Sequence, residues 1–235
     1  MPDPFSVSKG ELNPHWNTLG AGLAALLDSK ASRISLRPSP VGEAEIASIV
    51  GEAVRRAGRL RGDPMPVAPL RSLRWTWEAW VGYREVWNSL PGTEKFVFAS
   101  SDITLFFTIA GTEDFQQILR AEWMGLTDNA GDWTFTPGNA AHPHWQIDIT
   151  ETLKSDTDLQ TARELLRDSA PREFGAVPSA PFADPPWYRI GHMHFASAMR
   201  PWTDGEIAHC PSNLGAVRKW VIATIALLRT ELVRL

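Results

Sequence analysis

The chain has 235 residues, of which 43% are hydrophobic and 21% are charged, so it can bury a sizeable core in one compact domain over 1–235. Its 23 Lys and Arg residues against 27 Asp and Glu residues give a formal net charge of −4. That balance does not indicate nucleic-acid binding, although it does not exclude a local basic patch. The single cysteine, Cys210, excludes an internal disulfide and a cysteine-rich metal site.

The ends of the chain carry no sign of a membrane or export segment. The first residues, M-P-D-P-F-S-V-S-K-G, lack a cationic stretch followed by an apolar run. The longest apolar run, over 220–228, is far shorter than the roughly 20 residues that cross a bilayer. We therefore expect no membrane association and a cytoplasmic location, which also suits a chain with one cysteine.

The first third of the chain is predicted to be largely helical. Apolar residues recur at three-to-four spacing over 19–27, 43–57 and 73–87, which indicates three helices. Residues 32–36 form a short extended stretch, and three prolines in 61–69 indicate a loop. An N-terminal helical lobe over 1–68 would then precede a sheet core over 95–200. His15 stands alone in this region and is expected at the surface or at a helix cap.

The middle of the chain changes to an alternating pattern. Residues 96–98 and 103–109 flank 99–102 and indicate a hairpin, and 115–126 indicates a strand on which Arg120 and Glu122 share one face. A final helix is expected over 212–233, with its apolar stripe facing the core. The fold class is therefore α+β, a mostly antiparallel sheet of about five or six strands between Phe96 and Phe195. Helices from both ends of the chain pack on one face of it.

Four of the six histidines stand in two His-x-His pairs. The first pair, His142 and His144, lies in G-N-A-A-H-P-H-W-Q-I-D-I-T over 138–150. Because Pro143 cannot donate to a ladder, it suits the first position of a strand, so His144, Gln146 and Asp148 should form a polar row on that strand. The second pair, His192 and His194, lies on one face of an alternating stretch over 188–195.

Two strands carrying these pairs could hold a metal ion if they are neighbours. Residues i and i+2 of a strand lie about 7 Å apart on one face, so their imidazoles can converge on a divalent metal such as zinc. The ligands would be His144, His192 and His194, with His142 as a further candidate. Asp148 or Glu122 would supply a carboxylate. A water molecule on such a metal becomes a nucleophile for hydrolysis.

A metal-free site uses the same histidines as general acid and base, because the unperturbed pKa of histidine, about 6.5, suits both roles. Arg120 or Arg200 would then neutralise a phosphate, which favours a phosphodiester substrate. The structural alternative remains open, since His-x-His is a weak signature. The chain also has 11 Trp residues, and a Trp-rich sheet could satisfy these imidazoles without any chemistry.

Two families share part of these motifs. The pattern Gly138-x-x-x-His142-x-His144-x-x-x-Asp148 resembles the first motif of cupins, which are metal-binding barrels, but its spacing is shorter and Asp148 stands where they have Glu. The two strand-borne motifs resemble those of 2H phosphoesterases, in which a Ser or Thr follows each His by two residues. Here Gln146 and His194 occupy those positions, so the chain is assigned to neither family.

Two functions follow from these patterns. The leading hypothesis is a hydrolase acting on a phosphoester or nucleotide-type bond, with a catalytic set of His144, His192, His194, Glu122, Asp148 and Arg120. The alternative is a non-catalytic module in which Trp-rich surfaces bind a protein partner or close a homo-oligomer. A third use, stacking of a base on Arg74, Arg84 and the neighbouring Trp residues, would also be a binding function.

Overall fold

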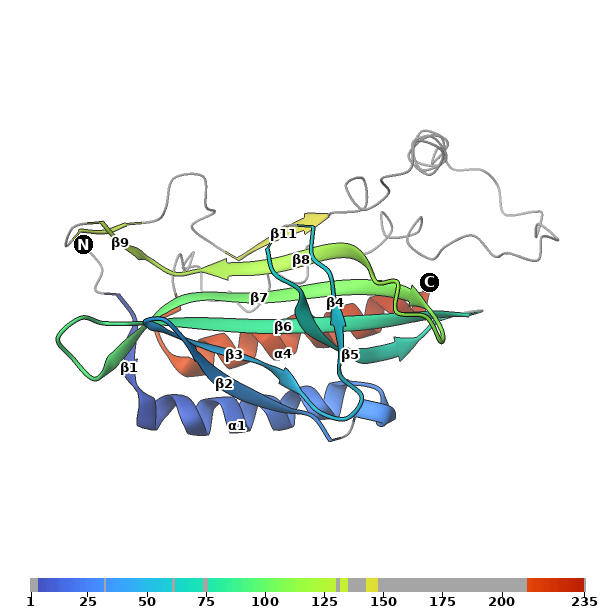
Figure 1. The fold of residues 1–235 in the computed structure, drawn as a ribbon, viewed down its shortest axis with the longest axis horizontal. Helices are drawn as coiled ribbons and strands as arrows, with labels where there is room; N and C mark the ends of the chain where they lie inside the picture. The colour runs from blue at the N-terminus through green and yellow to red at the C-terminus, as the bar shows by residue number, and fades with distance from the viewer. Residues whose placement is uncertain are drawn as a thin grey trace.

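The structure of the chain, a computed structural model, describes residues 4–31, 33–60, 62–73, 76–129, 132–134, 143–147 and 211–234. These residues form a nine-stranded antiparallel sheet, a separate two-stranded ribbon and two long helices (Figure 1). The α+β class with a mostly antiparallel sheet is confirmed, and the sheet has more strands than the five or six expected. Within these residues no helix is long and apolar enough to span a membrane.

The described chain contains two long helices, two short 3-10 turns and eleven strands. They are β1 (Ser6–Ser8), α1 (Lys9–Leu26), a short 3-10 turn (Ser29–Ala31), β2 (Ser35–Val41), β3 (Ala44–Val50), β4 (Arg55–Ala57), β5 (Met65–Ser72), β6 (Trp77–Ser89), β7 (Lys95–Ile109), β8 (Gln116–Met124), β9 (Thr127–Asn129), β10 (Asp132–Thr134), β11 (His144–Ile147), α4 (Leu214–Glu231) and a last 3-10 turn (Leu232–Arg234).

The long strands β6 and β7 form the spine of the sheet. The order across it is β11-β8-β7-β6-β3-β2, and β5 also pairs with β6 while carrying β4 on its other side. Strand β6 is long enough to take β5 along its first half and β3 along its second half. At the far edge, β2 contains Pro38 and Pro40. Proline lacks the N–H group that a further strand would need, so this edge resists extension.

Helices α1 and α4 pack against one and the same face of the sheet (Figure 1). His15 and Trp16 of α1 contact Glu85 of β6, and Trp220 of α4 stacks edge-on against Trp123 of β8 with 5.7 Å between ring centroids. The largest fully buried side chains gather in this layer: Trp16, Trp87, Trp123, Trp220, Tyr83, Phe98, Phe107, Leu12, Leu19, Leu23 and Ile49. Indole and phenyl rings bury much apolar area each, so they dominate the packing.

Four predicted elements were wrong. The expected helices over 43–57 and 73–87 are strands β3, β4 and β6, the expected loop over 61–69 contains the first part of β5, and the expected hairpin over 96–109 is one continuous strand, β7. The described residues before position 69 supply strands β1 to β4 and the first part of β5 to the sheet, together with helix α1, so they do not form a separate helical lobe. In β6 and β7 apolar residues lie on both sheet faces, which obscures the two-residue period, whereas the prolines of β5 suggested a loop.

The two helices begin with good caps. Helix α1 starts after Ser8, which forms a capping box with Glu11, and it continues through Pro14, its sixth residue. Helix α4 starts after Asn213, whose side chain accepts a hydrogen bond from the Ala216 N–H at 2.8 Å. Caps of this kind satisfy N–H groups that a helix terminus otherwise leaves open.

Candidate functional site

The face of the sheet opposite the helices carries a set of charged side chains in its centre. On β7, Ser101, Ile103 and Leu105 point toward the helices, so Asp102 and Thr104 point to the other face. Both of these polar residues are nonetheless buried. Their burial means that other polar groups must satisfy them.

Strand register aligns four of these side chains into one row across the sheet. His144 of β11 lies opposite Glu122 of β8, Glu122 lies opposite Asp102 of β7, and Asp102 lies opposite Arg84 of β6. We call these four residues the polar row. A second, parallel row consists of Gln146, Arg120 and Thr104. Directly opposed residues have Cβ atoms about 4.5–5.5 Å apart, so members of a row can contact one another.

Glu122 connects the two rows. One carboxylate oxygen, Oε2, lies 3.4 Å from His144 Nε2, and the other, Oε1, accepts a hydrogen bond from Arg120 Nη1 at 2.9 Å. Arg120 also donates through Nη2 to the Gln146 side-chain oxygen. The side chains of His144 and Glu122 are 27% and 19% exposed, whereas that of Arg120 is 8% exposed. The imidazole is therefore partly exposed, although its Nδ1 atom is buried, and the guanidinium is almost fully buried.

Asp102 is held by a second arginine. Arg59 follows β4 and reaches across to form an ion pair with Asp102 Oδ2, and Thr104 Oγ1 donates to Oδ1 at 2.9 Å. Residues 58–60 are fixed over this face, because the Leu60 N–H donates to the Gln117 side-chain oxygen at 3.1 Å. The Arg59 and Asp102 side chains are 3% and 5% exposed, so this pair is almost dry.

Gly82 of β6 lets Met65, at the start of β5, pack closely over the sheet, and we call β4 with the start of β5 the β4–β5 arm. A Cβ atom at Gly82 would lie 2.5 Å from Met65 Cε and 2.7 Å from Met65 Sδ. Met65 belongs to a small apolar cluster on this face that also contains Ala57, Val67, Trp80 and Phe106. The missing side chain of Gly82 thus gives Met65 its place, and the arm that it anchors carries Arg59 toward Asp102.

The two carboxyl groups of the polar row have pKa values shifted in opposite directions. Burial raises the pKa of Asp102, and the Arg59 charge only partly opposes this shift. Burial also acts to raise the pKa of Glu122, but the hydrogen bond from His144 and the Arg120 charge outweigh it and lower that pKa. Glu122 is therefore held as a carboxylate by the two residues that it contacts.

The structure brings together three of the residues named from sequence, His144, Glu122 and Arg120. His142, Asp148, His192 and His194 lie outside the described residues, as does Arg200. In the part of the chain that the structure describes, no three His, Cys, Asp or Glu side chains are grouped to hold a metal ion. The metal site proposed from sequence therefore depends on the remaining residues.

Sequence reasoning missed Arg59, Arg84 and Asp102 as members of this face. Asp102 was assigned to a hairpin turn and Arg84 to a helix, so neither could be aligned with Glu122. The alternation Ser101 to Leu105 was present in the sequence and would have indicated that Asp102 and Thr104 share a face. Arg59 comes from an irregular segment, and the sequence contains no pattern that places such a residue.

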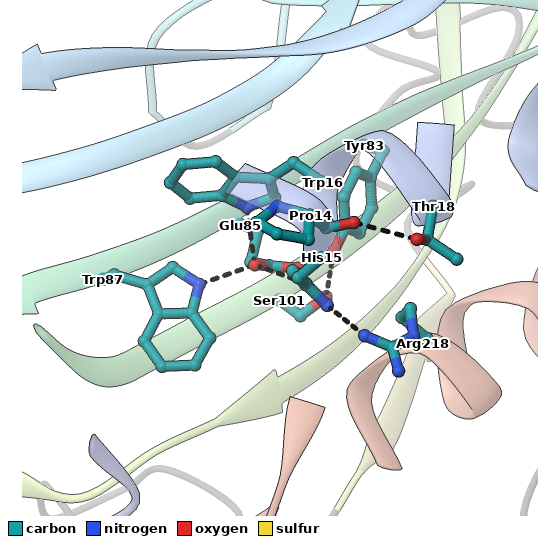
Figure 2. Close-up of polar contacts among 9 residues, drawn as sticks. All are labelled: Pro14, His15, Trp16, Thr18, Tyr83, Glu85, Trp87, Ser101 and Arg218. Carbon is teal, nitrogen blue, oxygen red and sulfur yellow. Dashed lines mark hydrogen bonds and ion pairs between the residues drawn. The ribbon is translucent and has the colours of Figure 1, made fainter. Parts of the chain in front are cut away.

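A second charged cluster lies on the opposite face, between the sheet and the helices (Figure 2). His15 was expected at the surface, but its side chain is fully buried and lies 3.0 Å through Nε2 from Glu85 Oε1. Glu85 also accepts from the Trp16 and Trp87 indoles and the Tyr83 hydroxyl, and Arg218 of α4 lies 3.3 Å from His15 Nδ1. This Glu85 network joins both helices to the sheet.

The burial of the Glu85 network indicates a structural role. Burial by itself acts to raise the pKa of Glu85, but the hydrogen bonds and charge of His15, with those from Tyr83 and Trp87, outweigh it and lower that pKa. Burial and the neighbouring Glu85 charge raise the pKa of Tyr83 well above its usual range. A carboxylate with this many donors and no exposed surface is satisfied internally.

The polar row, which is partly exposed, is therefore the candidate functional site. Comparison of the chain with protein-family profiles, with curated proteins and with solved structures finds no match.

Proposed function

We propose that the chain is a hydrolase of a phosphoester bond and that His144 transfers the proton in the reaction. One observation carries the proposal: Glu122 contacts His144 Nε2 at 3.4 Å and is itself held by Arg120. A carboxylate that accepts from one imidazole nitrogen fixes the tautomer and makes the other nitrogen a better base. Here the other nitrogen is Nδ1, which is buried, so a substrate must displace neighbouring groups to reach it. Glu122 and Arg120 are thus positioning residues, and His144 is the catalytic residue.

The reaction can be written with this arrangement. A water molecule attacks phosphorus while His144 accepts one of its protons, a new P–O bond forms, and the bond to the leaving oxygen breaks. The leaving oxygen then takes a proton from a second acid. His192 and His194, which the sequence places on a strand of their own, are the candidates for that acid. In a metal-assisted version, His144 would be a ligand and Glu122 its carboxylate partner.

Activity on a generic phosphodiester, bis-p-nitrophenyl phosphate, tests the proposal. His144→Gln should lower kcat by about 100-fold or more, because proton transfer by a positioned side chain contributes about 100- to 10,000-fold. Glu122→Gln should lower kcat by about 10- to 100-fold, as for other residues that orient an active group. Activity of the parent protein before and after dialysis against a chelator separates the metal-free and metal-assisted versions.

A matched control is Glu113→Gln, which makes the same chemical change at an exposed site. Glu113 is 80% exposed and lies 3.7 Å from Arg55, so its loss should leave both activity and stability unchanged. Equal activity of His144→Gln and the parent protein would contradict the proposal. So would the absence of phosphodiester turnover by the parent protein, with and without added zinc.

A non-catalytic binding module is the second candidate function. The observation that favours it is that Arg120, although buried, donates to both Glu122 and Gln146. Such internal pairing suits a network that fixes the fold. In that case the melting temperature of His144→Gln should fall, and no phosphoester in a broad panel should be hydrolysed by the parent protein.

A further inference from the structure

Arg84 is the residue of the polar row with the least compensated charge. Its side chain is 33% exposed, and the nearest carboxylate oxygen, Asp102 Oδ2, is 4.0 Å from Arg84 Nη2. Within the described structure, Arg84 Nε is buried and has no hydrogen-bond partner. A buried donor without a partner is costly, so the protein does not fully satisfy this guanidinium, and a ligand oxygen can reach it through the exposed part of the side chain.

Asp102 is an incomplete partner of Arg84, because the two lie 4.0 Å apart and Arg59 is the closer arginine. Oδ2 is paired with Arg59, and Oδ1 accepts from Thr104. In the same way Glu122 is neutralised by Arg120. Each carboxylate of the polar row thus has a closer arginine, and the positive charge of Arg84 is only partly compensated by Asp102. An arginine in this state binds phosphate or carboxylate groups, since its planar fork matches two of their oxygens.

The position of Arg84 relative to His144 restricts what it can bind. Both lie in the polar row on one face of the sheet, and three strand-to-strand steps separate them. At about 4.8 Å a step, their Cα atoms are about 14 Å apart. An anion on Arg84 is therefore not the group that reacts at His144. It is a second anionic group of the same molecule, on the far side of Asp102 and Glu122.

We propose that Arg84 binds a second anionic group of the substrate, so that the protein selects phosphoesters that carry a further phosphate or carboxylate, as in a nucleotide-type substrate. The statement that this anion belongs to a substrate rests on the proposed hydrolase function. The affinity of Arg84 for an oxyanion does not require turnover. Arg59 and Arg120 neutralise the two carboxylates between Arg84 and His144, so these carboxylates repel a doubly charged substrate less.

Binding of inorganic phosphate tests the subsite without any reaction. Calorimetric titration of the full chain with phosphate, at constant ionic strength with chloride as the reference anion, should show binding to the parent protein. Arg84→Gln should weaken it at least tenfold, and Arg84→Lys should lie between the two, because lysine keeps the charge without the fork. Binding should persist in His144→Gln, which separates this subsite from the catalytic proposal.

The control is Arg33→Gln, which removes the same charge from an 82% exposed side chain. Its phosphate affinity should equal that of the parent protein. If Arg84→Gln does not fold, Arg84→Lys decides alone. Equal phosphate affinity of the Arg84 variants and the parent protein would overturn the inference, as would no binding to the parent protein. Equal weakening in Arg33→Gln would reduce the effect to general charge.

Substrate preference tests the second anion directly. The dinucleotide pdTpdT has the same internal bond as dTpdT and one more phosphate, so the parent protein should hydrolyse it with a kcat/KM at least tenfold higher. Arg84→Gln should remove this preference, so that the kcat/KM of the variant for pdTpdT falls to its own value for dTpdT. Equal kcat/KM values for the two dinucleotides would refute the inference but leave the hydrolase proposal intact. Turnover of neither would refute the hydrolase proposal, and phosphate titration would then decide on Arg84.

Discussion

Replacement of Glu85 by glutamine should destabilise the protein strongly. Glu85 is fully buried, and its two oxygens share four donors: His15, Trp16, Trp87 and Tyr83. Glutamine has nearly the same volume, but it removes the charge and replaces one accepting oxygen by an NH2 group. Either orientation of the amide puts its NH2 group against donors, because Tyr83 and His15 contact Oε2 and the two indoles contact Oε1.

The size of the effect follows from these contacts. A hydrogen bond to a charged group contributes about 1.5–3 kcal/mol, and a neutral one contributes about 1 kcal/mol. Several bonds lose charge assistance at once, and breaking a buried ion pair costs about 3–5 kcal/mol. The lower desolvation cost of glutamine offsets part of this loss. We expect the free energy of unfolding of Glu85→Gln to fall by about 3 kcal/mol.

Urea denaturation at pH 7, followed by circular dichroism and Trp fluorescence, measures this loss. Glu113→Gln is the control, because an exposed substitution should change stability by less than about 0.5 kcal/mol. A double-mutant cycle with Tyr83→Phe should give a coupling energy of about 0.5–3 kcal/mol, as for residues of one network. A loss below about 1 kcal/mol in Glu85→Gln, with purely additive effects in the cycle, would refute the assigned role of the Glu85 network.

Three further predictions concern stability. The lowered pKa values of Glu85 and Glu122 mean that their stabilising contribution is complete above the ordinary glutamate value of 4.5 and is lost as the pH falls through the folded-state values. The urea midpoint should therefore drop below about pH 4.5, and it should drop less in Glu85→Gln. An unchanged slope in that variant would contradict this cause. Gly125→Ala should lower the free energy of unfolding by more than about 2 kcal/mol, because a Cβ atom there would overlap the Phe98 carbonyl oxygen. The control Gly58→Ala should be nearly neutral, since no atom lies within 4 Å of a Cβ atom there. Equal melting temperatures of the two variants would contradict the close contact of Gly125 with Phe98. Asn213→Ala removes the side-chain cap of α4 and should lower the free energy of unfolding by about 1 kcal/mol. Urea unfolding measures this change, and an unaltered free energy of unfolding would contradict the role of the cap.

Strand identity was predictable only where one face of the strand is polar. The segment over 115–126 was assigned correctly as a strand, since Arg120 and Glu122 alternate with Leu119 and Ala121. Strand β6 was taken for a helix because its apolar residues face both sides of the sheet. Trp80 packs in the small cluster around Met65, whereas Trp77, Val81 and Trp87 pack in the core beneath the helices. A strand covered on both sides loses its two-residue period, and the remaining Trp spacing fits a helix by coincidence.

The burial of His15 was also accessible from the sequence in principle. Residues Leu12, Trp16, Leu19 and Leu23 follow a helical stripe that places His15 on the edge of the same buried face. The helix was predicted only over 19–27, and Pro14 argues against an earlier start, because proline is usually confined to the first turn of a helix. The partner of His15 was beyond sequence reasoning, since Glu85 lies 70 residues away and joins it only when α1 packs on β6.

The candidate site depends on strand register more than on residue type. Strand β11 has only four residues and pairs with β8. Two side-chain contacts cross between these strands: Glu122 with His144, and Arg120 with Gln146. A shift of that pairing by one residue would turn His144 to the other face and would place Trp145 in the polar row. The two polar contacts therefore favour the register in which the imidazole joins Glu122. The polar row then serves both the fold and the proposed chemistry, and variants of Gln146 should weaken the site even though this residue lies in the second row.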